Sequence, residues 1–241
     1  MTNDAPRLLA NGDAAISVDF GNRIDVNLNE RVHALDKALK TRDLPYLIET
    51  VPTYRALMVH FDPVTVDYHE LCSILTELAG QTVQKEAAQR RWRVPVAYGG
   101  EFGEDLDVIA AHAGLSPEAF VGAHMAKVYT VFMIGFLPGF CYLGGLDPRL
   151  AMPRRDQPRL RIPSSSISVG GAQTAIGTVE GPSGWHLIGR TPVIPFMTNR
   201  SPIFLFEAGD EILFTRISEE EWRNLSASAA RGEPIAELLT P

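Results

Sequence analysis

The first part of the chain combines two hydrophobic periods. Residues 14–20 alternate between apolar and polar side chains, which predicts a strand. In residues 27–40 the apolar side chains recur at helical spacing, and Asn27 and Glu30 precede them at capping-box spacing, so we expect an amphipathic helix. Two short strands, a second helix and a further strand follow, at residues 46–51, 55–61, 67–79 and 91–98. This β-α-β-β-α-β order is the split βαβ, or ferredoxin-like, pattern.

The remainder of the chain has a different pattern, with many short β-runs between glycines and prolines. Two helices come first, at residues 104–113 and after Ser116-Pro117, because Ser is a favoured N-cap and Pro a favoured first helical residue. A final helix begins at Ser218. The strands expected between these helices are residues 127–135, 166–169, 173–178, 185–190, 203–206 and 211–216.

Many short strands joined by Gly and Pro turns are typical of a β-barrel or a β-sandwich. The pattern therefore predicts two domains. Residues 1–90 form an α+β ferredoxin-like domain, and residues 91–241 form a mainly β domain that ends in a helix.

Composition narrows the function classes. Hydrophobic residues make up 45% of the chain and charged residues 21%, which suits a folded protein with a substantial core. The net charge of −7 disfavours a nucleic-acid binder. The longest apolar run is near residues 131–137, too short for a membrane span, and the two cysteines are far apart with no metal-ligand spacing. We expect a cytoplasmic protein without a metal site.

The charge is unevenly distributed. Residues 141–200 hold seven arginines against three acidic residues, a net +4, which leaves −11 for the rest of the chain. Four of these arginines lie on a proline-flanked loop: Arg154, Arg155, Arg159 and Arg161. Arginine forks bind carboxylates and phosphates with two parallel hydrogen bonds, so this loop is a candidate anion site. The alternative interpretation is that these arginines are ordinary surface residues in contact with solvent.

Two other features are candidates for chemistry. Gly170-Gly171-Ala172-Gln173-Thr174 allows close backbone approach to a ligand, with the Gln173 amide beside it. His124 and His186 are candidate acid–base groups, although a lone histidine is more often a packed residue. The chain has neither the GxxxxGK[ST] phosphate loop nor the GxSxG nucleophile elbow.

Longer stretches of the chain resemble a known family, the one that contains the B subunit of 5-oxoprolinase (PxpB), the kinase inhibitor KipI and allophanate hydrolase subunit 1. The resemblance covers nearly the whole chain. It includes Val51-Pro52-Thr53-Tyr54-Arg55 and residues 98–106. Its most specific stretches are residues 135–150, Pro153-Arg154-Arg155, residues 170–174 and residues 185–192.

The resemblance implies that the second domain is a cyclophilin-like β-barrel. It also implies one component of an ATP-dependent complex that hydrolyses 5-oxoproline to glutamate, a hetero-oligomer with a C-type paralogue and an A-type protein as partners. ATP would be used by the complex, and no cofactor is expected on this chain alone. Two alternatives stay open: a KipI-type inhibitor that binds a sensor histidine kinase, and the carboxyltransferase component of a urea-carboxylase-like system.

The resemblance implies a small carboxylated substrate, and we assign a role toward it to several residues. We expect His124 to act as the acid–base group and Gln173 to orient the amide carbonyl. The expected substrate-binding residues are Arg154, Arg155, Arg161, Arg190 and Tyr142.

Overall fold

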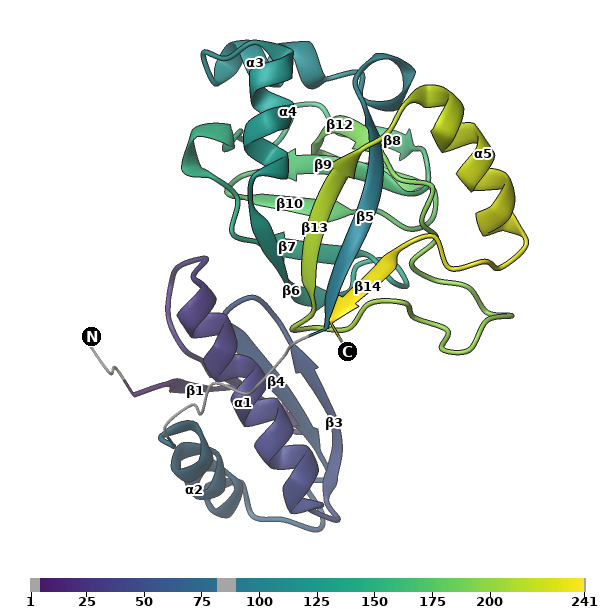
Figure 1. The fold of residues 1–241 in the computed structure, drawn as a ribbon. Helices are drawn as coiled ribbons and strands as arrows, with labels where there is room; N and C mark the ends of the chain where they lie inside the picture. Colours follow the sequence, from purple (N-terminus) through teal and green to yellow (C-terminus); the bar gives the residue numbers. More distant parts are fainter. Residues whose placement is uncertain (1–4, 82–89, 241) are drawn as a thin grey trace. The chain divides into compact units, whose positions relative to one another are not determined.

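The computed structural model describes residues 5–81 and 90–240 (Figure 1). The chain divides into two compact units, Met1–Ala87 and Ala88–Pro241. Each unit closes around a hydrophobic core of its own. Among the described residues, no helix combines the length and the apolarity that crossing a bilayer requires.

The first unit is an antiparallel sheet with two helices. Its strand order is β1-β2-β4-β3. Leu35 and Leu39 from the first helix and Leu71 and Leu75 from the second are buried in its core, which confirms the amphipathic spacing of both segments. The elements are β1 (Arg7–Ala10), β2 (Ala15–Asp19), α1 (Val26–Arg42), β3 (Leu47–Pro52), β4 (Ala56–Phe61) and α2 (Tyr68–Ala79).

The α+β class is confirmed, but two details differ from the sequence prediction. The fourth strand of this sheet is β1, a short and mostly exposed edge strand, whereas the strand at Arg91–Tyr98 belongs to the second unit. Four consecutive residues of that strand, from Val94 to Ala97, are buried, which suits a barrel wall better than an edge. The second difference concerns the start of helix α1, which the sequence places at Asn27. The helix is capped by Asp25, whose carboxylate accepts hydrogen bonds from the amides of Asn27 and Leu28.

The second unit is a closed barrel with added helices. Seven strands follow the order β12-β9-β10-β7-β6-β13-β5, and pairing of β12 with β5 closes the ring. Only the β13–β5 pair in this ring is parallel. The elements are β5 (Arg91–Tyr98), η1 (Gly100–Phe102), α3 (Leu106–His112), α4 (Pro117–Met125), β6 (Val128–Ile134), β7 (Cys141–Gly144), η2 (Pro148–Leu150), β8 (Arg159–Ile162), β9 (Ser166–Gly170), β10 (Gln173–Ile176), β11 (Gly181–Ser183), β12 (His186–Arg190), β13 (Glu211–Arg216), α5 (Glu219–Ala230) and β14 (Glu237–Thr240).

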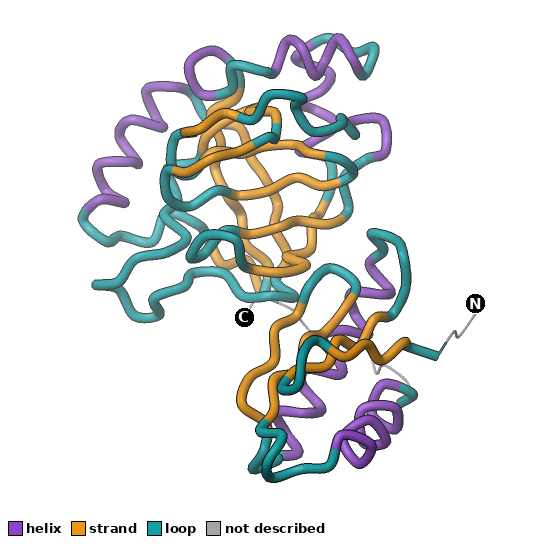
Figure 2. The backbone as a smooth tube through the Cα atoms, turned by 180° about the vertical axis from the view of Figure 1, so that it is seen from behind, coloured by secondary structure: helices purple, strands orange, loops and turns teal. Residues whose placement is uncertain are grey.

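The barrel is the mainly β domain that the sequence predicts. Helices α3 and α4 cover one end of it, and α5 lies beside β5 (Figures 1 and 2). Strand β14 extends the sheet at β5, and β8 pairs with β11 as a separate ribbon. The strand expected at residues 203–206 is wrong: this segment makes only an isolated bridge between Phe196 and Phe204. It lies in a proline-interrupted loop, which leaves no regular ladder to join.

Candidate functional site

Five residues form an apolar cluster on one side of strands β9, β10 and β7, and we call it the aromatic face: Leu137, Phe140, Tyr142, Ala175 and Trp185. Tyr142 lies directly opposite Ala175 in the β7–β10 ladder. A Cβ atom added to Gly170 would lie 2.5 Å from the indole of Trp185, so this glycine lets the tryptophan ring rest on the sheet. Ring centroids are 4.7 Å apart for Phe140 and Tyr142 and 5.7 Å apart for Tyr142 and Trp185.

Gln173 shares this side of the sheet. It precedes Ala175 by two residues on β10, and its cross-strand partner is Gly170. The side chain is only 7% exposed, and its Nε2 atom has no hydrogen-bond partner among the residues that the structure describes. A buried amide donor without a partner costs about 1–3 kcal/mol. Such a donor beside aromatic rings is therefore a candidate contact for a ligand's carbonyl oxygen.

Arg154 lies next to the same rings. Its guanidinium carbon is 5.8 Å from the centroid of the Trp185 ring. Burial raises the pKa of Tyr142, and the charge of Arg154 opposes that effect. The side chain of Arg154 is exposed, and it forms no ion pair with any acidic residue in the described parts of the chain. The structure therefore brings together three of the residues selected from the sequence: Arg154, Tyr142 and Gln173.

The other selected arginines are engaged elsewhere. Arg155 and its neighbour Arg159 bind the buried carboxylate of Asp105. Arg161 pairs with Glu180 at the surface. Arg190 is half-buried with its guanidinium carbon 4.8 Å from the centroid of Trp222, and burial lowers the pKa of Arg190. The basic segment is thus largely neutralised by this chain's own acids, which the one-dimensional charge count does not show.

His124 belongs to helix α4 and is fully buried. Its Nε2 is 3.1 Å from Oγ1 of Thr174, and that hydroxyl donates to the carbonyl of Ser168 at 2.9 Å. Thr174 must therefore accept from Nε2–H, which leaves Nδ1 to accept from the hydroxyl of Tyr98 at 3.0 Å. Burial lowers the pKa of His124 to about 3, so the ring is neutral at physiological pH.

His124 and Gln173 consequently occupy opposite sides of β10. Thr174, which His124 binds, directly follows Gln173, and successive strand residues point to opposite faces. The geometry favours a structural role for His124 behind the sheet. The acid–base role expected from the sequence stays a prediction.

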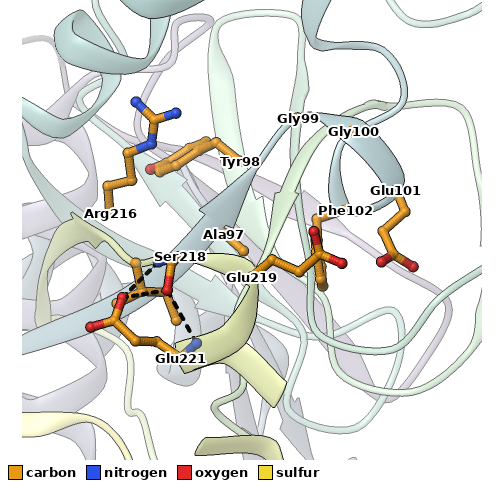
Figure 3. A pocket seen from close by; sticks show the side chains of 11 residues that line it. Ala97, Tyr98, Gly99, Gly100, Glu101, Phe102, Arg216, Ser218, Glu219 and Glu221 are labelled. Carbon is orange, nitrogen blue, oxygen red and sulfur yellow. Dashed lines mark hydrogen bonds between the residues drawn. The ribbon is translucent and has the colours of Figure 1, made fainter. Parts of the chain in front are cut away.

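A cavity of about 500 Å³, which was not among the features predicted from the sequence, lies between the β5–η1 turn and the β13–α5 turn (Figure 3). Its lining includes Tyr98, Glu101 and Arg216. The one signal for it is the Gly99-Gly100 pair, where both residues have positive φ. Its charged residues are engaged within the chain: Arg223 bridges Glu101 and Glu219, and Arg216 binds Glu118 at 2.6 Å. Glu221 accepts hydrogen bonds from Ser218. The aromatic face, with an unpaired amide and an exposed arginine, is therefore the better candidate site.

Potential metal ligands do not gather anywhere in the described chain. Within residues 5–81 and 90–240, no three His, Cys, Asp or Glu side chains are grouped in a way that could hold a metal ion.

Comparison with known proteins identifies the family. Residues 6–206 match the family described as carboxyltransferase domain, subdomain C and D. The B subunit of the Bacillus subtilis 5-oxoprolinase is 37% identical over 88% of this chain and 92% of that protein. The chain belongs to the family of 5-oxoprolinase B subunits. A second B subunit, from Escherichia coli O157:H7, is 34% identical over 84% of this chain and 92% of that protein. The resemblance stated from the sequence is confirmed.

A solved structure extends the comparison to three dimensions. The crystal structure of TTHA0988 superposes with a TM-score of 0.75 at 33% identity and covers 85% of this chain. This chain spans 40% of the length of that one. The fold of this family therefore also occurs as part of a longer polypeptide.

Proposed function

We propose that this chain acts as the B subunit of an ATP-dependent 5-oxoprolinase complex, and that its aromatic face holds the 5-oxoproline. Membership of the family and the B-subunit relatives that match most of the chain support the activity. The observation that supports the site is the buried Nε2 of Gln173, which finds no partner in the described parts of the chain and lies on the side of β10 that carries the aromatic face. The guanidinium of Arg154 lies over the Trp185 ring of the same face.

The chemistry of the substrate fits this arrangement. 5-Oxoproline is a five-membered lactam with one carboxylate. The guanidinium of Arg154 would bind the carboxylate through two parallel hydrogen bonds, and Gln173 would donate to the lactam oxygen. The rings of Tyr142 and Trp185 would pack against the apolar edge of the lactam. Hydrolysis then adds water across the C–N bond and produces the second carboxylate and the free amine of glutamate.

Partner subunits would complete this reaction. Of the polar residues at the aromatic face, Arg154 is a permanent cation, Gln173 does not titrate, and burial raises the pKa of Tyr142 above its ordinary value. None of these three serves as a general base at neutral pH. We infer that activation of the water and of ATP takes place on a C-type paralogue and an A-type protein, with this chain binding and orienting the substrate.

Reconstitution tests the activity. The chain is mixed with its A-type and C-type partners, 5-oxoproline and ATP, and glutamate release is measured against the partners alone. Release above that background is expected, and equal release with and without this chain contradicts the proposal.

A pair of arginine variants tests the site. Arg154→Ala should raise KM for 5-oxoproline by about 10- to 100-fold, because a hydrogen bond to a charged group contributes about 1.5–3 kcal/mol. Arg161→Ala removes an exposed arginine of the nearby strand β8, which forms an ion pair with Glu180, and it should leave KM unchanged. Equal effects of the two substitutions would show that general positive charge, rather than Arg154, attracts the substrate.

A further inference from the structure

The buried carboxylate of Asp105 is bound from two separate parts of the chain. It is 5% exposed, and it follows the glycine-rich stretch at residues 98–103. Arg159 binds both of its oxygens at 2.8 Å, and Arg155 binds Oδ1 at 3.1 Å. The backbone amide of Leu187 donates to Oδ2 at 2.8 Å. Burial acts to raise the pKa of Asp105, but these hydrogen bonds and charges outweigh it and hold the pKa below its usual value.

The loop that carries Arg154 is anchored on both sides of that residue. On one side, Nε2 of His186 donates to the carbonyl of Pro153 at 3.0 Å. On the other side, the amide of Arg155 donates to the carbonyl of Gly184 at 2.7 Å, and its guanidinium binds Asp105. Arg154 is thus flanked by two residues with fixed positions, while its own side chain lies over the Trp185 ring.

We propose that Asp105 is a positioning residue that holds the 153–159 loop in place, so that Arg154 stays over the aromatic face, ready for an anionic substrate. The proposal rests on the proposed function for the identity of that substrate. It also gives a role to Asp105, which belongs to residues 98–106, a stretch that shares in the family resemblance and that the aromatic face does not use.

The energetics favour this role over simple packing. A buried carboxylate is stable only when it is paired, and removal of one member of a buried ion pair destabilises the groups that remain. Without the charge of Asp105, the guanidinium groups of Arg155 and Arg159 lose their shared partner. Both residues would then turn toward solvent, and the loop between Pro153 and Arg159 would lose one of its anchors. Ordering that loop again on binding would weaken substrate affinity.

The first experiment needs no substrate. Asp105→Asn removes the charge and keeps the shape, and tryptic cleavage after Arg154 and Arg155 is followed by mass spectrometry. We expect cleavage at these bonds to become at least about tenfold faster. The matched control is Asp147→Asn, because Asp147 is also a buried carboxylate with a bidentate arginine partner, Arg149, outside this loop. It should leave cleavage at the two bonds unchanged.

The second experiment uses the reconstituted complex. Asp105→Asn should raise KM for 5-oxoproline about tenfold with kcat within twofold of the parent value. In an Arg154→Ala background the same substitution should change KM less than twofold, because Asp105 acts through Arg154. Additive effects on KM would overturn the proposal, and so would unchanged tryptic protection of the loop.

A milder variant keeps the test decisive if Asp105→Asn does not fold. Arg155→Gln removes one half-buried arm of the cluster and leaves the pair between Asp105 and Arg159 in place. It should raise KM about threefold and accelerate cleavage after Arg154 in parallel, and a change in neither quantity overturns the proposal. If the parent complex releases no glutamate, the proposed function fails, whereas the proteolysis result still decides whether Asp105 holds the loop.

Discussion

At the scale of single residues, the environment decides what a titratable side chain can do. His124 is an ordinary candidate acid–base residue in the sequence. In the fold its two ring nitrogens are occupied by Tyr98 and Thr174, and its ring stacks on Phe214 with centroids 4.9 Å apart. Burial lowers its pKa to about 3, far from the pH at which a histidine exchanges protons readily.

The first prediction concerns acid stability. The folded state keeps His124 neutral down to about pH 3, whereas the unfolded chain protonates it below about pH 6.5. Protonation therefore favours the unfolded chain as the pH falls below about 6.5, and the free energy of unfolding decreases. Between pH 7.5 and pH 5 this amounts to about 2 kcal/mol of unfolding free energy. Urea unfolding at both pH values, followed by tryptophan fluorescence, measures this decrease in unfolding free energy. In His124→Gln the decrease between the two pH values should be smaller by about 2 kcal/mol.

Tryptophan fluorescence is a suitable probe because all three tryptophans, Trp92, Trp185 and Trp222, belong to the barrel unit that contains His124. NMR titration of the His124 ring provides an independent measurement. Protonation of that ring in the folded protein at pH 5 would contradict the prediction.

At the scale of elements, the β9–β10 hairpin carries different chemistry on its two sides. Ala175 belongs to the aromatic face, and Gln173 lies on the same side of β10. On the other side, Thr174 contacts His124 and Ile176 packs in the barrel core. Because side chains alternate along a strand, the candidate site lies on one side of the hairpin, and the buried contacts of Thr174 and Ile176 lie on the other side. Gly170 at the end of β9 is part of this arrangement, since the ring of Trp185 occupies the space of its missing side chain.

A second prediction follows for this hairpin. Gly170→Ala places a methyl group 2.5 Å from the Trp185 indole, so the ring must move. We expect a loss of about 1–3 kcal/mol of stability, as for other overpacked sites, and a shifted tryptophan emission spectrum. Urea unfolding and fluorescence measure both effects. Gly122→Ala in α4 is the control, because no atom of the described chain lies within 4 Å of its added methyl group, and it should be neutral or stabilising by up to about 1 kcal/mol.

At the scale of the whole molecule, ion pairs neutralise most of the basic segment, and each unit has its own hydrophobic core. The net +4 of residues 141–200 is not a broad cationic surface, because acids inside and outside that segment pair with most of its arginines. These pairs include Arg149 with Asp147, Arg155 and Arg159 with Asp105, and Arg161 with Glu180. Each unit also encloses its own core, with no residue shared between the two main clusters.

The third prediction is that the barrel unit folds by itself. A fragment of residues 90–241 retains all seven strands of the closed ring and the whole of its core cluster. It should unfold cooperatively in urea and show the tryptophan emission of the full chain. A fragment with the emission of solvent-exposed tryptophan and no unfolding transition would contradict this expectation.

Much of the fold was predictable because its elements carry local signals. The caps at Asp67, Ser116 and Ser218 begin helices where the sequence predicts them, since each side chain satisfies free backbone amides nearby. Strand β1 gave no comparable signal, because a short exposed edge strand needs no alternating apolar face. The strand Arg91–Tyr98 was recognised, but its sheet was not, because hydrogen-bond partners far along the chain decide which sheet a strand joins.

Patterns along the chain were enough to establish the two-part architecture, the family and the residue types available for an anionic substrate. Those properties depend on local periodicity, on composition and on long family-specific stretches. Which of the arginines stay available became clear only in the folded molecule. Asp105, far away in sequence, neutralises Arg155 and Arg159, while Arg154 next to them lies exposed over Trp185. Ion pairing and burial depend on distances in space, and a linear chain of residues does not contain them until it folds.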